Sequence, residues 1–275
     1  MVAAGIWSFA AVTLSVPLRY RRIILWEHSV LRWRIRHERS VTLGAILLAL
    51  LSWRASDVVS VSDASAKAAR PFLWSPRTRR RVIPNIVPTN SSEERPADRT
   101  GDVRLVGLGS LTPRKNWGLA IDAMSHLGDS YSLDIYGDGP EMASLRDQIR
   151  ELEIGNRVTL RGHVPNASEL LPEYDVVVQT SFAETFGYAL MEAADAGLPT
   201  VAIAMPVMDS FIPDYVPGRV VSADPVAIAA AIEEVMQSGV DFDEALEKRR
   251  QEFSVGRIVA AWRDVALNHP GDIHV

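Results

Sequence analysis

The sequence predicts an α/β fold in two parts that are joined by a linker. From Val103 onward, short apolar runs of strand length alternate with longer segments of helical pattern, as in a parallel sheet covered on both faces. Residues 89–101 interrupt this pattern with a polar stretch that contains Asn, Ser, Pro and Gly, the composition of a linker. With 275 residues, 47% of them apolar, the chain is long enough for one large or two modest cores.

Residues 1–88 form the first predicted part. Short apolar runs next to turn-forming residues predict three strands there, at residues 23–26, 58–61 and 80–85. Ser62 and Asp63 follow the second of these strands. We expect them to cap a helix, because their side-chain oxygens can accept hydrogen bonds from the free amides of a helix start.

Two further apolar runs of the first part do not have the features of membrane or signal segments. Residues 41–53 are too few to cross a bilayer. Residues 1–18 lack the basic start and the cleavage site of a signal peptide. We therefore expect an amphipathic or buried helix in each run.

The second part, residues 102–252, carries the regular alternation of strands and helices. Helices are expected at residues 117–127, from Pro140 to about Leu152, and from near Gly187. The loops at the carboxyl ends of parallel strands should line one crevice, which is where open α/β sheets bind ligands. The pattern places strands at residues 103–109, 132–136, 158–161, 175–179 and 200–204.

Two glutamates in residues 181–200 are separated by seven residues. Glu184 lies in the loop after a strand, and Glu192 lies about two turns inside the following helix. An ionised carboxylate only accepts hydrogen bonds, so Glu192 can hold a cis-diol and Glu184 can hold sugar hydroxyls. Between them, Gly187 opens the helix, where free amides and the positive end of the dipole suit a diphosphate. The alternative is an ordinary loop glutamate and a solvated helix face.

This stretch, with Phe186-Gly187 inside it and Gly197-Leu198-Pro199 after it, resembles the retaining GT4-like glycosyltransferases, also called glycosyl transferases group 1, of the GT-B fold. The resemblance covers about residues 22–268. It implies a complete C-terminal Rossmann-like donor domain over residues 102–252 and a partial N-terminal, acceptor-side Rossmann-like domain over residues 1–88. It also implies that a terminal amphipathic helix within residues 253–275 crosses back to the first domain.

The resemblance also implies the reaction. A sugar would move from a nucleoside-diphosphate sugar to an acceptor hydroxyl with retention of configuration, without a metal ion and with no cofactor beyond the donor. The acceptor would be a glycan, a lipid-linked molecule or a small molecule, and nucleic acid is not an expected partner. Because the family normally has a first strand and a Gly-rich loop before this point, we expect either a shortened relative or a recorded start that is too late.

Lys115 is the expected catalytic cation, because its loop follows the first strand of the second part and an ammonium can offset charge on a departing diphosphate. The family's first arginine is replaced by Ser110, and Arg114 can supply the guanidinium or remain a solvated side chain. Where the resemblance places them, the expected catalytic residues are Glu184, Lys115, Arg114 and His28. The expected donor-binding residues are Glu192, Phe186, Gly187, Tyr188, Gly109, Ser110, Asp138, Gly139, His163 and Val164. His28 and His163 could instead be structural.

The composition bears on the compartment and on partners. The chain has no cysteine, which fits a reducing, cytoplasmic compartment. Residues 1–100 carry 16 Lys and Arg against 7 Asp and Glu, and five of the seven tryptophans lie before residue 75. Basic charge with tryptophan suits the anionic inner face of a membrane, which predicts peripheral attachment there. The alternative is a basic solvated face over a core that contains tryptophan.

Two other functions stay open at this point. The first is a catalytically inactive, truncated GT-B protein that binds a nucleotide sugar or acts as an interaction module; Ser110 and the missing first strand favour it. The second is a sugar-nucleotide epimerase or hydrolase, which would need water-activating carboxylates or histidines in the crevice. The sequence contains no clear set of that kind, no carboxylate pair typical of glycosidases, no Asp-x-Asp motif and no spacing typical of a metal cage.

Overall fold

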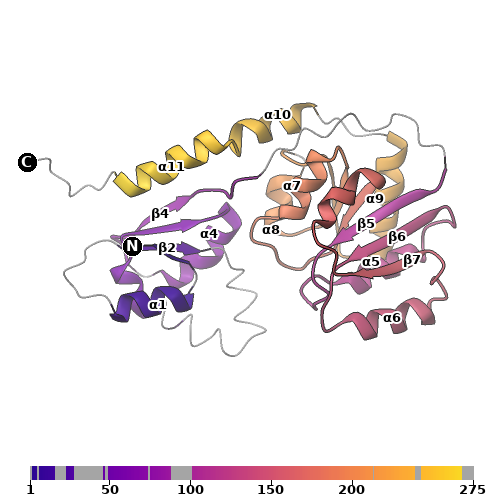
Figure 1. Ribbon diagram of the computed structural model, residues 1–275, viewed down its shortest axis with the longest axis horizontal. Coiled ribbons are helices and arrows are strands. Elements are labelled where there is room, and N and C mark those ends of the chain that lie inside the picture. The colour runs from indigo at the N-terminus through magenta and orange to yellow at the C-terminus, as the bar shows by residue number, and fades with distance from the viewer. Residues whose placement is uncertain are drawn as a thin grey trace, which may run out of the picture. The chain divides into compact units, whose positions relative to one another are not determined.

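The computed structural model describes residues 2–4, 6–15, 23–27, 46, 49–73, 75–87, 101–212, 214–238 and 243–267 (Figure 1). The chain divides into two compact units. Unit 1 comprises residues 1–86, 184–186 and 253–275, and unit 2 comprises residues 87–183 and 187–252. Each unit is built on its own parallel sheet, so the predicted α/β class is confirmed.

Unit 2 has a six-stranded parallel sheet in the order β10-β9-β8-β5-β6-β7. Because all its strands run the same way, the loops that follow them gather at one edge of the sheet. The strands are β5 (Val103–Leu108), β6 (Tyr131–Tyr136), β7 (Val158–Gly162), β8 (Val176–Gln179), β9 (Thr200–Ile203) and β10 (Gly218–Val221). The five strands predicted for this part are confirmed to within one or two residues, and β10 was not predicted.

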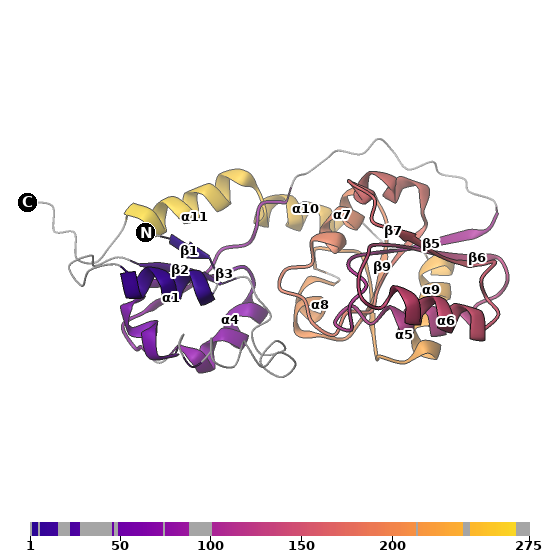
Figure 2. The same ribbon diagram turned by 60° about the horizontal axis from the view of Figure 1, so that its bottom comes forward.

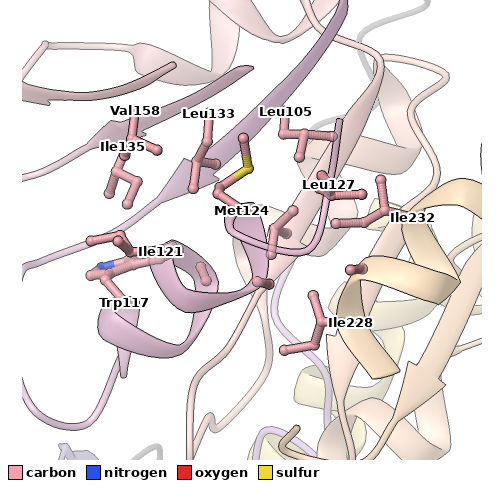
Figure 3. Packing of buried hydrophobic residues seen from close by; sticks show 14 of the residues in the cluster. Leu105, Trp117, Ile121, Met124, Leu127, Leu133, Ile135, Val158, Ile228 and Ile232 are labelled. Atoms are coloured by element: carbon pink, nitrogen blue, oxygen red, sulfur yellow. The ribbon is translucent and has the colours of Figure 1, made fainter. Parts of the chain in front are cut away.

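Helices cover both faces of this sheet. They are α5 (Trp117–Met124), α6 (Met142–Glu151), the 3₁₀ helix η3 (Ala167–Glu173), α7 (Tyr188–Asp195), α8 (Pro206–Phe211), α9 (Pro225–Ser238) and α10 (Asp243–Glu252). Side chains alternate along a strand, so Val176 and Val178 pack with α5, α6 and α9, whereas Val177 packs with η3 and α7. Figure 3 shows the first of these cores, with Trp117 and Ile121 of α5 packed beneath Leu133 and Ile135. Burial on both faces explains the continuous apolar strands.

Unit 1 has a four-stranded parallel sheet in the order β1-β2-β3-β4. Its strands are β1 (Val2–Ala4), β2 (Ile24–Glu27), β3 (Asp57–Ser60) and β4 (Arg79–Val82), and its helical segments are α1 (Ile6–Ser15), η1 (Ser52–Arg54), α4 (Asp63–Ala69), η2 (Arg70–Phe72) and α11 (Val255–Leu267). Figure 2 shows α11 along one face of the sheet and α1 and α4 on the other. Ile258 and Val265 of α11 pack on Ile24 and Val59, and the rings of Trp26 and Trp262 meet edge-on at 5.5 Å.

The cap predicted at the start of α4 is confirmed. Ser62 accepts a hydrogen bond from the amide of Ser65, and the side chain of Ser65 accepts one from the amide of Ser62, which makes a capping box. The helix expected in residues 1–18 is present as α1, whereas the strand formed by residues 2–4, which pair with β2 before α1 begins, was not predicted. Among the described residues, no helix combines the length and the apolar character that crossing a bilayer requires.

Candidate functional site

A pocket of about 280 Å³ lies at the carboxyl edge of the sheet in unit 2. The loops after β5, β6 and β7 form its walls, and η3 adds one residue. Its lining residues are Leu108, Gly109, Ser110, Tyr136, Gly137, Asp138, His163, Val164 and Ala167. Gly109, Ser110, Asp138, His163 and Val164, which the sequence places in three separate loops, are thus brought together. The pocket lies where an open parallel sheet is expected to bind a ligand.

Main-chain contacts interlock the loops after β5 and β6. The amide of Gly109 donates to the carbonyl of Tyr136 at 2.9 Å, and the amide of Leu111 donates to the carbonyl of Asp138 at 2.9 Å. A Cβ atom at Gly137 would lie only 1.9 Å from the carbonyl oxygen of Gly109, and the φ of Gly137 is +151°. A Cβ atom at Gly139 would lie 2.3 Å from the carbonyl oxygen of Leu111. This crossing therefore requires glycine at both positions.

Lys115 lies next to the pocket with its side chain buried; only 8% of the residue is exposed. The end of the lysine side chain lies against Gly109. If this glycine carried a Cβ atom, that atom would lie only 2.8 Å from the Nζ of Lys115. The lysine backbone is fixed as well, because the Thr180 hydroxyl donates to the carbonyl of Lys115 at 3.0 Å. The structure thus brings the predicted cation next to Gly109 and Ser110.

Arg114 ties the Lys115 loop to the loop that follows β8. Its Nη1 donates to the carbonyl of Ala183 at 2.7 Å, and the amide of Phe182 donates back to the carbonyl of Arg114 at 2.9 Å. These two bonds give the arginine a role in holding backbone, which the sequence did not indicate. Its contact with a donor diphosphate stays a prediction.

Helix α7 begins at Gly187, which is the N-cap residue with a left-handed φ of +79°. No side chain caps this end of the helix, and Tyr188 is 48% exposed. Glu192 is half-buried in the second turn, and burial and then the neighbouring Asp195 raise its pKa. Burial and then Glu192 raise the pKa of the Tyr188 phenol. The helix start therefore lacks a side-chain cap, which leaves its amides uncovered by a capping oxygen, as an anion site requires.

A buried polar network beneath the pocket was missed by sequence reasoning. The hydroxyls of Tyr136 and Tyr174 are hydrogen-bonded at 2.8 Å, and Tyr174 donates to Asp134 at 2.7 Å. Arg161 completes the network, with its Nε 2.9 Å from Asp134. Burial and then these hydrogen bonds raise the pKa of Tyr174 well above its ordinary value. Because Tyr136 also lines the pocket, the network fixes one wall.

Three of the predicted residues belong to unit 1 or lie outside the description. Glu184 and Phe186 cluster with unit 1, where the Phe186 ring meets Phe253 edge-on at 5.7 Å. In the same segment, the Ser62 hydroxyl donates to the carbonyl of Thr185 at 2.6 Å. His28 lies outside the described residues. Joint binding of one ligand by Glu184 and Glu192 stays a prediction.

No group of three or more His, Asp or Glu side chains with metal-site geometry occurs among the residues described above.

Comparisons with known proteins identify the family and the fold. A sequence model of the family described as "Glycosyl transferases group 1" matches residues 90–253. The 2-deoxystreptamine glucosyltransferase of Streptomyces kanamyceticus is 23% identical over 210 residues, which cover 70% of this chain and 52% of the relative. The GtfA subunit of the UDP-N-acetylglucosamine–peptide N-acetylglucosaminyltransferase of Streptococcus agalactiae is 37% identical over 75 residues, 27% of this chain and 15% of that protein. This chain thus spans about half or less of the length of these relatives.

Solved structures show the same architecture. The crystal structure of HepE from Anabaena in complex with UDP and glucose has a TM-score of 0.82 at 20% identity, covering 96% of this chain and 77% of that one. The pneumococcal O-GlcNAc transferase GtfA in complex with UDP and GlcNAc has a TM-score of 0.68 at 18% identity, with 94% and 59% covered. At these identities the likeness shows the fold alone.

Proposed function

This chain belongs to the glycosyl transferases group 1 family and has its GT-B type fold, and we propose that it transfers a sugar from a UDP-sugar to an acceptor hydroxyl. The observation that carries the proposal is the pocket at the carboxyl edge of the unit 2 sheet, which gathers five residues predicted for the donor site. The names of the relatives and neighbours, which include UDP, glucose and N-acetylglucosamine, support uridine as the nucleoside.

The chemistry of each group fits a part of the donor. The pocket next to His163 and Val164 would take the base, and its mixed lining of backbone and side chains suits a flat heterocycle. The amides at the start of α7, which no side chain caps, would bind the diphosphate, and Glu192 would accept hydrogen bonds from the ribose diol. Lys115 would stabilise the charge that builds on the leaving diphosphate.

For the chemical step, we propose retention of configuration without a metal ion. The acceptor hydroxyl attacks the anomeric carbon on the face that the diphosphate leaves, and a diphosphate oxygen takes the hydroxyl proton. A new C–O bond thus replaces the bond to UDP, and no oxidant or metal is consumed. The protein's contribution is positioning and charge stabilisation, with Glu184 holding hydroxyls of the donor sugar.

Two measurements test this function. A thermal-shift screen of nucleoside-diphosphate sugars should give its largest stabilisation with a UDP-sugar, because ligands that bind the folded state raise its melting temperature. The selected donor is then incubated with glycan, lipid-linked and small-molecule acceptors in the presence of a chelator, and the anomeric configuration of the product is read by NMR. A product with inverted configuration, or release of free sugar alone, would overturn the proposed reaction.

Glu192 should contribute directly to donor binding. Replacing Glu192 by alanine removes an acceptor for the ribose diol, so we expect UDP-sugar binding to weaken by about 1–3 kcal/mol in calorimetry. The matched control is Glu234→Ala, because Glu234 forms an exposed ion pair with Arg219 on β10. Equal affinities for the wild type and Glu192→Ala would remove Glu192 from the site.

We further propose that unit 1 docks on an anionic bilayer. The Arg54 guanidinium donates to the carbonyl of Thr13, which places the end of α1 next to η1. Three apolar side chains of this region, Leu14, Leu50 and Trp53, are 70%, 56% and 62% exposed. Basic charge dominates the first hundred residues of the chain, and this charge is complementary to phosphatidylserine.

Vesicle sedimentation tests this docking. We expect binding to phosphatidylserine vesicles at about 0.05 M salt that weakens strongly at about 0.5 M, since surface charges are then screened. The double variant Leu14→Glu, Trp53→Glu should lose binding, whereas Val226→Glu, at an exposed apolar residue of α9, should retain it. Equal sedimentation with neutral and anionic vesicles, or no effect of the double variant, would contradict the proposal.

A further inference from the structure

Arg249 on α10 is buried against α7, the helix that carries Glu192. Only 2% of the arginine is exposed. Its Nη1 donates to the carbonyl of Met191 at 3.0 Å, and its Nη2 pairs with the Asp195 carboxylate, whose side chain is 12% exposed. All of these residues belong to unit 2. A buried arginine therefore holds the last turn of α7 by its backbone and by its charge.

Asp195 lies three residues after Glu192 on the same helix. Side chains at this spacing are neighbours on one face, and two like charges there repel each other. The pKa of Glu192 is raised first by burial and then by Asp195, so the aspartate acts on the glutamate. The guanidinium of Arg249 forms an ion pair with this aspartate.

We propose that Arg249 is a positioning residue for the donor site: it fixes the last turn of α7 and offsets part of the negative charge that Asp195 places beside Glu192. This inference rests on the proposed function, because it assumes that Glu192 accepts hydrogen bonds from the donor. Sequence reasoning gave no sign of it, since Arg249 is separated from Met191 by 58 residues.

Other charged or titratable groups lie on α7 and on the elements that pack against it. On α7 itself, Tyr188 stands one turn before Glu192. Helix η3, which packs on the apolar face of α7, carries Glu169 and also Glu173, which lies 3.6 Å from Arg104. The hydroxyls of Tyr136 and Tyr174 lie at the same face of α7. They are hydrogen-bonded to each other, and the hydroxyl of Tyr174 is also hydrogen-bonded to Asp134.

The remaining neighbours of α7 are β9 and α10. Strand β9 contacts α7 and has no titratable side chain. On α10, Lys248 pairs with Glu244 and Asp214. Among these groups, Arg249 forms an ion pair with Asp195.

The pH dependence of donor binding follows from the charges. Glu192 can accept both hydrogen bonds of a diol only when it is ionised, so affinity should fall as the pH drops through its pKa. Arg249→Met removes the guanidinium from beside Asp195, which should raise the pKa of Glu192 further and move the midpoint of binding to higher pH. Asp195→Asn leaves the positive Arg249 alone near Glu192 and moves the midpoint to lower pH. The double variant removes both charges and should return the midpoint to near the wild-type value.

The experiment measures the Kd of UDP-glucose by calorimetry between about pH 4 and about pH 8 for the 275-residue chain and these variants. The diphosphate of UDP-glucose is esterified at both ends and does not titrate in this range. A change of the Kd with pH therefore reports a titration of the protein. We expect each single variant to shift the midpoint by about 1 pH unit in opposite directions. Arg249→Lys keeps the charge and should keep the midpoint, and Arg219→Met, which breaks an exposed ion pair of β10, should not move it.

The outcomes separate this inference from the proposed function. A purely structural role of Arg249 predicts that Arg249→Met weakens binding equally at every pH, which would overturn the inference. If Glu192→Gln abolishes the pH dependence but the Asp195 and Arg249 variants leave the midpoint in place, the inference fails and the donor site stands. If Glu192→Gln matches the wild type at every pH, the role of Glu192 itself fails. Should Arg249→Met not fold, Asp195→Asn and the double variant, which bury no unpaired acid, decide the question.

Discussion

Replacing Lys115 by alanine should lower the kcat of sugar transfer by about 10²- to 10³-fold, while the Kd of the UDP-sugar should change by less than about tenfold. Charge on the diphosphate grows as the bond to the sugar breaks, so a buried ammonium stabilises the transition state more than the bound donor. The lysine is held for this role by its position over Gly109 and by the hydrogen bond from Thr180 to its carbonyl. Single-turnover kinetics and calorimetry on the same preparation measure the two effects.

Lys248→Ala is the matched control for this prediction. Lys248 is another of the chain's three lysines, and its side chain is 48% exposed and paired with Glu244. Its loss should leave both kcat and the Kd within about twofold of the wild type, as for most surface changes. If Lys115→Ala weakens binding and transfer by the same factor, Lys115 only anchors the donor and its proposed catalytic role is wrong.

Replacing Gly137 by alanine should lower the free energy of unfolding by about 3 kcal/mol or more and remove UDP-sugar binding. The new Cβ atom would lie 1.9 Å from the carbonyl oxygen of Gly109, so one loop must move away from the other. The φ of +151° adds backbone strain for any residue with a side chain. Denaturant unfolding and calorimetry with UDP-glucose measure the two consequences.

Gly128→Ala provides the comparison. This glycine lies between α5 and β6, and a Cβ atom there would have no atom within 4 Å and no positive φ to accommodate. Its free energy of unfolding should stay within about 0.5 kcal/mol of the wild type, or rise slightly because alanine restricts the unfolded chain. A Gly137→Ala protein with wild-type stability and affinity would show that the loop crossing does not shape the pocket.

The core strands of unit 2 were predictable from sequence because burial on both faces of a strand produces an apolar run of consecutive residues. Strand β8 is buried on both faces, and Val176, Val177 and Val178 therefore form an unbroken apolar run. Strand β10 could not be recognised in the same way, since it is an edge strand that includes the partly exposed Arg219. Strand β1 has only three residues, which are too few to show the alternation of apolar and polar side chains by which a strand is recognised. Pairing with β2, rather than its own sequence, determines its conformation.

The candidate site was predictable only where topology determines it. Gly109, Asp138 and His163 follow three neighbouring parallel strands, so their convergence follows from the order of the strands. The contacts of Arg114 and Arg249 join residues 69 and 58 positions apart, and no local pattern announces such pairs. For that reason the sequence suggested a free guanidinium at Arg114, whereas the structure shows it bonded to the carbonyl of Ala183.

The crossing of the loops after β5 and β6 has a consequence for how donor preference can change. Its contacts are made by main-chain atoms, so an exchange of side chains away from the glycines, other than to proline, leaves them in place. Side chains such as those of Ser110 and Ala167 can therefore be exchanged around the pocket while the wall behind them keeps its shape. Selectivity for a new sugar nucleotide could thus evolve, or be selected in the laboratory, at little risk to folding.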